Sequence, residues 1–192
     1  MKRTFLTLTL ALFALGTTQA TEPVEIEKKE VKTKESKVAW KAYKVTGSHN
    51  GTVDLKSGTL MFDNDKLTGG EFTVDMTTLI ATDLEGESRQ KLEGHLKSDD
   101  FFSVASNPTA SLVFTKVKST GKNSYEVTGN LTVKNISKPV TFDVSVYGSK
   151  ATATMKVDRT QFEVKYGSGS FFDDLGDKTI YDEFDLVVDL EF

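Results

Sequence analysis

The sequence predicts an all-β fold, in which eight antiparallel strands form a barrel and one helix lies between the third and fourth strands. Three observations carry this prediction. Apolar and polar side chains alternate with a period of two in eight segments, and short turn sequences join most of these segments. The helix is predicted by one stretch of helical periodicity inside an otherwise strand-like chain.

The eight alternating segments are the expected strands. They lie at about 36–42, 51–63, 68–77, 110–116, 127–133, 140–146, 151–157 and 182–192. In each segment one face is largely apolar, and the other carries mostly Lys, Thr, Asp, Ser or Glu. Strands with one apolar face need a shared interior, which a sandwich or a closed barrel provides. Consecutive hairpins favour a meander, and closure into a barrel removes its bare edges. Alternation alone does not distinguish a filled interior from a hollow one.

Turn sequences separate these strands. They are Asp63-Asn64-Asp65, Gly121-Lys122-Asn123, the segment from Asn135 to Lys138, and Gly148-Ser149. A longer connection, from Asp158 to Tyr181, precedes the last strand.

The helical stretch lies within residues 83–114. Leu84, Ser88, Leu92 and Leu96 recur every four residues and share one helical face. Phe101-Phe102 and then Pro108 end the pattern before the fourth strand. A plug, a lid and a plain connector are all consistent with this pattern.

The N-terminal residues have the pattern of a secretory signal peptide over 1–20, with a basic start, an apolar run and small residues before a cut after Ala20. The alternative, a transmembrane anchor, needs about 20 apolar residues, and this run is shorter. Residues 21–35 are dense in Glu and Lys and are expected to form a charged, flexible leader, which leaves 36–192 as one domain. The protein is therefore expected to be periplasmic or secreted.

Composition excludes several functions. The net charge of −4 argues against nucleic acid and anionic lipid surfaces as partners. The absence of cysteine excludes thiol chemistry and cysteine zinc sites. Polar outward faces argue against stable membrane insertion as an outer-membrane barrel. His49 and His95 are the only histidines, and no metal site, cofactor or catalytic group is expected from them. The Gly167–Ser170 segment lacks the Gly-x-Ser-x-Gly pattern of a nucleophile, so the chain is not expected to be an enzyme.

Three motifs point to a known family. They are HLKSDDFFSVASNPTASLVF at 95–114, GNLTVKNISKPVTFDV at 129–144 and DRTQF at 158–162. In their order and content they resemble the YceI-like family, and the resemblance extends over 36–192. It implies an extended, lipocalin-like eight-stranded antiparallel barrel whose cavity binds a long apolar chain. The ligands implied are isoprenoids, isoprenoid quinones and fatty acyl or amide lipids, and some family members are linked to stress responses.

The candidate site is the inward-facing apolar set. Alternation alone favours a packed core, whereas the resemblance implies a cavity with room left by Ala42, Ala110, Gly129, Ala151 and Ala153. The residues expected to line it are Trp40, Phe62, Phe72, Val74, Met76, Leu92, Leu96, Phe101, Phe102, Leu112, Phe114, Leu131, Phe142, Val144, Met155, Phe162, Phe184 and Leu186. The helix is expected to cover one end of this cavity.

Three hypotheses of function remain at the level of the sequence. The first is a binding protein that transports, stores or sequesters a long-chain lipid. The second is a stress-related structural or partner-binding barrel without a physiological lipid, and a homodimer is one possible assembly. The third, an enzyme acting on a lipid inside the barrel, has no nucleophile–base pair to support it.

Overall fold

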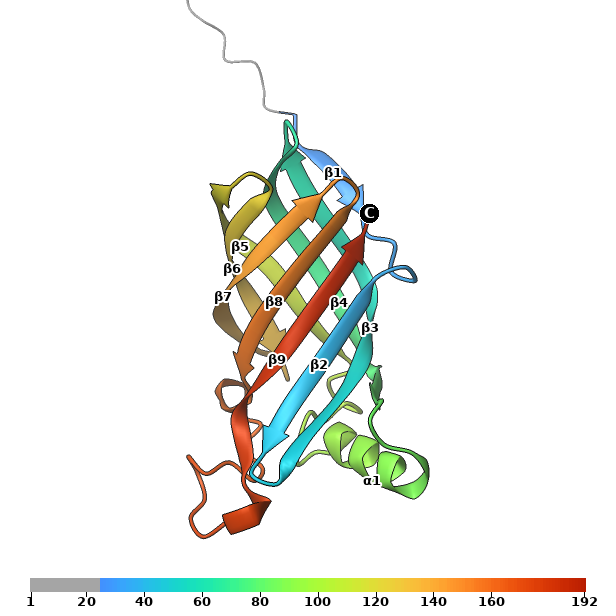
Figure 1. Cartoon of the computed structure of the whole chain (residues 1–192), viewed down its shortest axis with the longest axis vertical. Coiled ribbons are helices and arrows are strands. Elements are labelled where there is room, and N and C mark those ends of the chain that lie inside the picture. Colours follow the sequence, from blue (N-terminus) through green and yellow to red (C-terminus); the bar gives the residue numbers. More distant parts are fainter. Residues whose placement is uncertain (1–24) are drawn as a thin grey trace, which may run out of the picture.

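A closed antiparallel β-barrel forms the frame of the protein in the computed structural model, which describes residues 25–192 (Figure 1). The strands are β1 (Glu27–Glu30), β2 (Lys37–Lys44), β3 (Gly47–Asp63), β4 (Lys66–Ala81), β5 (Thr109–Gly121), β6 (Ser124–Val133), β7 (Ile136–Tyr147), β8 (Lys150–Asp158) and β9 (Ile180–Glu191). Each of β2 to β9 pairs with its neighbour in the chain, and β2 also pairs with β9, which closes an eight-stranded ring. The predicted fold class is therefore confirmed. The predicted signal peptide lies outside the described residues.

Several strands are longer than the alternation predicts. β3 begins at Gly47 and not near residue 51, because the β2–β3 hairpin turns within two residues and the ladder starts at Lys44 and Gly47. The turn expected from Asn135 to Lys138 is wrong by a few residues. The chain turns at Lys134 and Asn135, whose φ angles are 50° and 60°, as a two-residue hairpin turn requires.

The predicted leader contains a strand, which corrects the expectation of a wholly flexible segment over 21–35. β1 pairs with the second half of β3, from Glu27 opposite Phe62 to Glu30 opposite Thr59. β1 and β2 pair with the same edge of β3 at different points along its length. Because β3 is much longer than β2, part of that edge would be unpaired without β1. The following residue, Val31, is only 7% exposed. Backbone pairing and this one apolar contact therefore order a charged segment.

The described residues contain one α-helix, α1 (Gly86–Lys97), between β4 and β5 as predicted. It lies at one end of the barrel, together with the irregular connection over 159–179, which includes the 3₁₀ helices η1 (Arg159–Phe162) and η2 (Gly176–Lys178) (Figure 1). The carboxylate of Glu93 accepts a hydrogen bond from the Ala81 backbone N–H at 3.0 Å, and Lys97 donates to the Thr77 carbonyl at 2.9 Å. These bonds fix α1 to the end of β4. No helix in residues 25–192 has both the length and the apolar character that crossing a bilayer requires.

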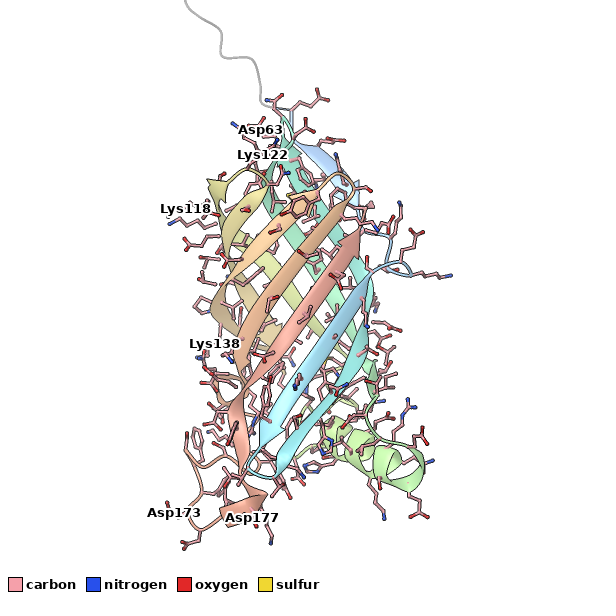
Figure 2. The ribbon with its side chains drawn as sticks, viewed as in Figure 1. Asp63, Lys118, Lys122, Lys138, Asp173 and Asp177 are labelled. Carbon is pink, nitrogen blue, oxygen red and sulfur yellow. The ribbon has the colours of Figure 1, made fainter. Side chains whose placement is uncertain are left out.

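The end of the barrel opposite α1 is filled by apolar side chains. Phe62 is 2% exposed, and its ring lies 5.6 Å from that of Phe192 near the C-terminus. Leu67 and Tyr125 are also buried. Charged side chains such as Lys118, Lys122 and Lys138 project outward from the barrel in Figure 2. The apolar faces predicted by alternation thus meet inside, and the polar faces meet water.

Candidate functional site

The barrel interior contains two adjoining chambers. The distal chamber, away from α1, is bordered by Leu60, Phe142 and Leu190, and its empty space amounts to about 680 Å³. The helix-end chamber, bordered by Leu96 and Phe101, has about 870 Å³. Both figures include the parts that reach solvent. The chambers adjoin because they share wall residues, which are Val38, Val74, Ala110, Leu131 and Leu186.

The walls are apolar because the inward position of nearly every strand carries an aliphatic or aromatic residue. In the distal chamber the ring of Phe114 lies 5.5 Å from that of Phe72 and 5.8 Å from that of Phe142. A Cβ atom at Gly70 would approach the Phe114 ring to 2.9 Å, so only glycine allows this ring to lie against β4. Space remains where the wall residue is small, as at Ala153.

Of the small residues expected to make room, Ala42, Ala110, Ala151 and Ala153 lie on the walls, but Gly129 does not. A Cβ atom at Gly129 would meet the Leu112 side chain at 2.9 Å and the Val113 carbonyl at 3.0 Å. Gly129 therefore serves close packing between β5 and β6 and leaves no space in the cavity.

The helical segment covers the helix-end chamber. Leu96, at the end of α1, and Phe101 and Phe102, just after it, contribute to the wall. The Phe102 N–H donates to the Leu96 carbonyl at 3.1 Å, which folds this segment back on the helix. Leu96 is the only buried residue of α1, and Ser88 of the predicted apolar face is exposed. Of the three possibilities for this stretch, the structure supports a cover, formed mainly by the turn after the helix.

A buried arginine joins the cover to the rest of the barrel. Arg159 of η1 is 3% exposed and lies on the wall of the helix-end chamber. It donates hydrogen bonds to the carbonyls of Val164 at 2.6 Å, Ile180 at 3.0 Å and Tyr181 at 3.1 Å. Its guanidinium lies 5.5 Å from the Phe101 ring centre. Burial lowers the pKa of Arg159, while the charges of Asp182 and Asp158 act in the opposite direction.

The two histidines make separate contacts near the cover, His49 with the segment before α1 and His95 with the turn after it. His49 Nδ1 is 2.8 Å from Oδ2 of Asp83, and Oδ1 of the same carboxylate accepts a hydrogen bond from the Asn50 N–H at 3.1 Å. Burial acts to raise the pKa of Asp83, but these hydrogen bonds and the His49 charge outweigh it, and the pKa is lowered. His95 packs edge-on against Phe101 and Tyr166. Within residues 25–192 no three His, Cys, Asp or Glu side chains are grouped as a metal site.

Most residues predicted to line the cavity do so. The wall includes Trp40, Phe72, Val74, Met76, Leu96, Phe101, Phe102, Leu112, Phe114, Leu131, Phe142, Val144, Met155, Phe184 and Leu186. Phe62, Leu92 and Phe162 are not wall residues. Phe62 fills the far end, and Leu92 lies one turn of α1 before the part that reaches the chamber. Phe162 is buried in η1, which packs against β7 and β9.

Several wall residues were not predicted. The apolar ones are Val38, Val53, Leu55, Leu60, Leu79, Val133, Ile180, Val188 and Leu190, and most of them share the inward register of residues that were predicted. The polar ones include Arg159 and Tyr181. Arg159 belongs to the DRTQF motif, and a charged residue directly after an alternating strand was the available signal.

Comparison with known proteins identifies the fold and its relatives. The YceI-like domain matches residues 30–192. A UPF0312 protein of Pseudomonas putida strain GB-1 is 34% identical over 151 residues, which is 77% of this chain and 74% of the relative. The crystal structure of Burkholderia cenocepacia BcnA superposes with a TM-score of 0.66 at 23% identity, covering 83% of this chain and 98% of that one. A polyisoprenoid binding domain from Saccharophagus degradans, implicated in plant cell wall breakdown, gives a TM-score of 0.56 at 11% identity and covers 87% and 99%.

Proposed function

We propose that this chain, which belongs to the YceI-like family, holds a long-chain lipid inside its barrel. Family membership and the barrel fold support a lipid-binding role that involves no catalysis. The finer proposal is that the ligand is an isoprenoid, an isoprenoid quinone or a fatty acyl or amide lipid, and that the protein transports, stores or sequesters it in the periplasm or outside the cell.

One observation carries this proposal, which is the apolar tract formed by the two adjoining chambers. An extended lipid tail needs a dry passage with few polar groups along its length. Val74, Leu131 and Leu186 border both chambers, so the chambers meet at these side chains, and a chain that extended past them would occupy both. A filled barrel of the same strand pattern would have no such space.

Burial energy makes a long apolar chain the favoured occupant. Each methylene moved from water into the tract gains about 0.8 kcal/mol. About ten buried methylenes therefore gain as much as a micromolar complex requires, about 8 kcal/mol, before the costs of binding are subtracted. Affinity obtained this way grows with chain length.

Similarity to a solved structure adds support for an isoprenoid. The Saccharophagus degradans domain is described as polyisoprenoid-binding and has the same overall fold. Branched isoprenoid chains need a tract that is wider in places than a straight acyl chain requires. Alternation of Ala110 and Ala153 with the larger Phe114 and Met155 along the walls provides uneven width of this kind.

The test is to identify what the purified protein carries. The protein is expressed with its N-terminal segment intact, purified without detergent and extracted with organic solvent, and the extract is examined by mass spectrometry. The expected result is a long-chain lipid in stoichiometric amount. The chain's one Trp, Trp40, lies on the wall, so reloading the extracted protein with a quinone lipid should quench its fluorescence. Failure to recover or reload any lipid would overturn the proposal and favour the stress-related barrel without a ligand.

A further inference from the structure

We propose that residues 85–107, which form α1 and the turn after it, act as a hinged gate through which a lipid enters and leaves the barrel. The gate turns on its side next to β4, and on the opposite side a hydrogen bond between Asn107 and Asn135 holds it shut. This proposal rests on the proposed function and adds two things to it. It gives the lipid a route, and it names the residue pair that controls the rate of exchange.

The other boundaries of the tract are held by more bonds than the gate. Each of β2 to β9 is paired along both edges, so passage between two strands would break several backbone hydrogen bonds at once. At the far end, the rings of Phe62 and Phe192 meet at 5.6 Å. At the helix end, the connection over 159–179 is joined to the β2–β3 turn by a backbone hydrogen bond of 3.1 Å from the Val45 N–H to the Thr179 carbonyl.

Backbone hydrogen bonds hold the gate together but do not join it to the barrel. The Phe102 N–H donates to the Leu96 carbonyl at 3.1 Å. The Val104 N–H donates to the Lys97 carbonyl at 3.0 Å, so the turn and the end of α1 form one body. Within residues 25–192, no hydrogen bond between backbone groups links the gate to another segment. A segment attached in this way opens at a lower free-energy cost than a paired strand.

Three side-chain hydrogen bonds attach the gate to the rest of the described chain, and two of them are on β4. Glu93 and Lys97 bond backbone groups near the end of β4, the strand that precedes the gate. The third bond lies on the other side of β5, where Asn135 Nδ2 in the β6–β7 turn donates to Asn107 Oδ1 at 2.8 Å. The gate is therefore hinged at β4 and latched at Asn135.

Opening at the latch uncovers the tract. Phe101 and Phe102 are wall residues of the helix-end chamber, so both leave the wall when the gate turns. The Phe101 ring rests 5.5 Å from the Arg159 guanidinium, whose own hydrogen bonds go to carbonyls outside the gate. Arg159 therefore stays in place when the gate moves. Phe101 and Val104 are each only 6% exposed, and their burial favours the closed position.

Loosening the latch tests the proposal by kinetics. Asn135 has a φ of 60°, which glycine adopts without strain, so Asn135→Gly removes the hydrogen bond and keeps the turn. All-trans-retinol, an isoprenoid alcohol, is mixed with the delipidated protein, and energy transfer from Trp40 reports its uptake. We expect loading and release both to become about two- to tenfold faster, as the loss of one net hydrogen bond allows, with an unchanged Kd. Asn123→Gly is the matched control, because Asn123 has a φ of 64° in the β5–β6 turn at the far end (Figure 2).

Closing the latch covalently gives a second readout. The chain contains no cysteine, so Asn107→Cys combined with Asn135→Cys supplies one thiol pair across the latch. The pair is linked with dithiobismaleimidoethane, whose internal disulfide is cleaved by dithiothreitol, and folding is checked by circular dichroism. Loading and release of retinol should be lost in the linked protein and should return in the same sample after cleavage. The same link between Thr77→Cys and Lys97→Cys, on the hinge side, should still allow retinol to exchange.

Two outcomes overturn the gate, and a third overturns its premise. If Asn135→Gly loads and releases retinol at the wild-type rates, or if the protein linked across the latch exchanges retinol as fast as the cleaved protein, the lipid takes another route. The kinetic comparison remains decisive even if the cysteine pair does not fold. If wild-type protein binds no retinol, the failure is that of the lipid-binding function itself.

Discussion

Leu131→Trp tests whether the tract must be open along its whole length. Leu131 lies on β6, is 8% exposed and borders both chambers. A larger side chain at this junction should close the passage between them. A ligand could then still enter the helix-end chamber, but the tail of a long lipid could not reach the distal chamber.

The size of the effect follows from the length of the distal chamber. Its wall on β8 extends from Ala151 to Met155, which are four residues apart at about 3.3 Å each, or about 13 Å along the strand. If only five methylenes of the tail lose their place there, about 4 kcal/mol of burial is lost at about 0.8 kcal/mol each. That loss weakens binding by nearly three orders of magnitude.

The assay measures lipid content and stability on the same preparations. Lipid recovered per mole of protein is determined by mass spectrometry of organic extracts, and stability is measured by urea unfolding. Overpacking a dense core costs about 1–3 kcal/mol, and the cost here should be at the low end because the new ring enters empty space. Asn130→Trp is the matched control, because Asn130 is the exposed neighbour of Leu131 on the same strand. A folded Leu131→Trp protein that carries as much long-chain lipid as wild type would refute the reasoning.

Two further predictions concern the barrel itself. Gly51→Ala should lower the free energy of unfolding by about 3 kcal/mol or more, because the new Cβ atom would lie 1.8 Å from the Ile80 carbonyl oxygen. Gly94→Ala, which has open space around it in α1, should raise the free energy of unfolding by up to about 1 kcal/mol. Equal melting temperatures for the two variants would contradict this. Tyr43 donates a hydrogen bond of 2.6 Å to Asp185, and this bond lowers the pKa of Asp185 and raises the pKa of Tyr43. Tyr43→Phe should remove the bond and both pKa shifts. The stabilisation from this bond is complete between the ordinary pKa values of about 4 and about 10, and it is lost as the pH falls through the lowered pKa of Asp185 or rises through the raised pKa of Tyr43. Urea unfolding across pH should show the largest difference between wild type and variant inside that window, and a difference that is as large at pH 2 would contradict the assignment.

Alternation was sufficient to predict the inward register because side chains on a strand point alternately to the two faces. Trp40, Phe142 and Met155 therefore occupy the wall positions that a period of two assigns to them. Alternation did not predict β1, because Glu27–Glu30 contains only Glu and Lys and is held by backbone pairing with β3. A charged sequence of this kind gives no periodic signal.

Periodicity also did not predict that Arg159 is buried beside the cover, for a different reason. Arg159 is buried because its guanidinium donates to the Val164 carbonyl and to the consecutive carbonyls of Ile180 and Tyr181 at the start of β9. Contact with a segment that is distant in the sequence leaves no local pattern. The motif that contains Arg159 was recognised, but the inward position was assigned to Phe162. Arg159 lies on the chamber wall and Phe162 does not, and this difference depends on the backbone path of η1.

Whether the barrel is hollow depends on the size of side chains that alternation treats as equal. At the closed end, the inward positions near Phe62 and Phe192 carry large rings that meet each other. In the middle of the barrel, Ala110 and Ala153 occupy equivalent inward positions and meet empty space. A sequence pattern counts each of these as apolar, although an alanine leaves several methylene volumes unfilled. The binding tract is therefore encoded in where alanine replaces a larger residue on the inward face, and enlarging those alanines one at a time should fill the tract from inside without altering the strand register.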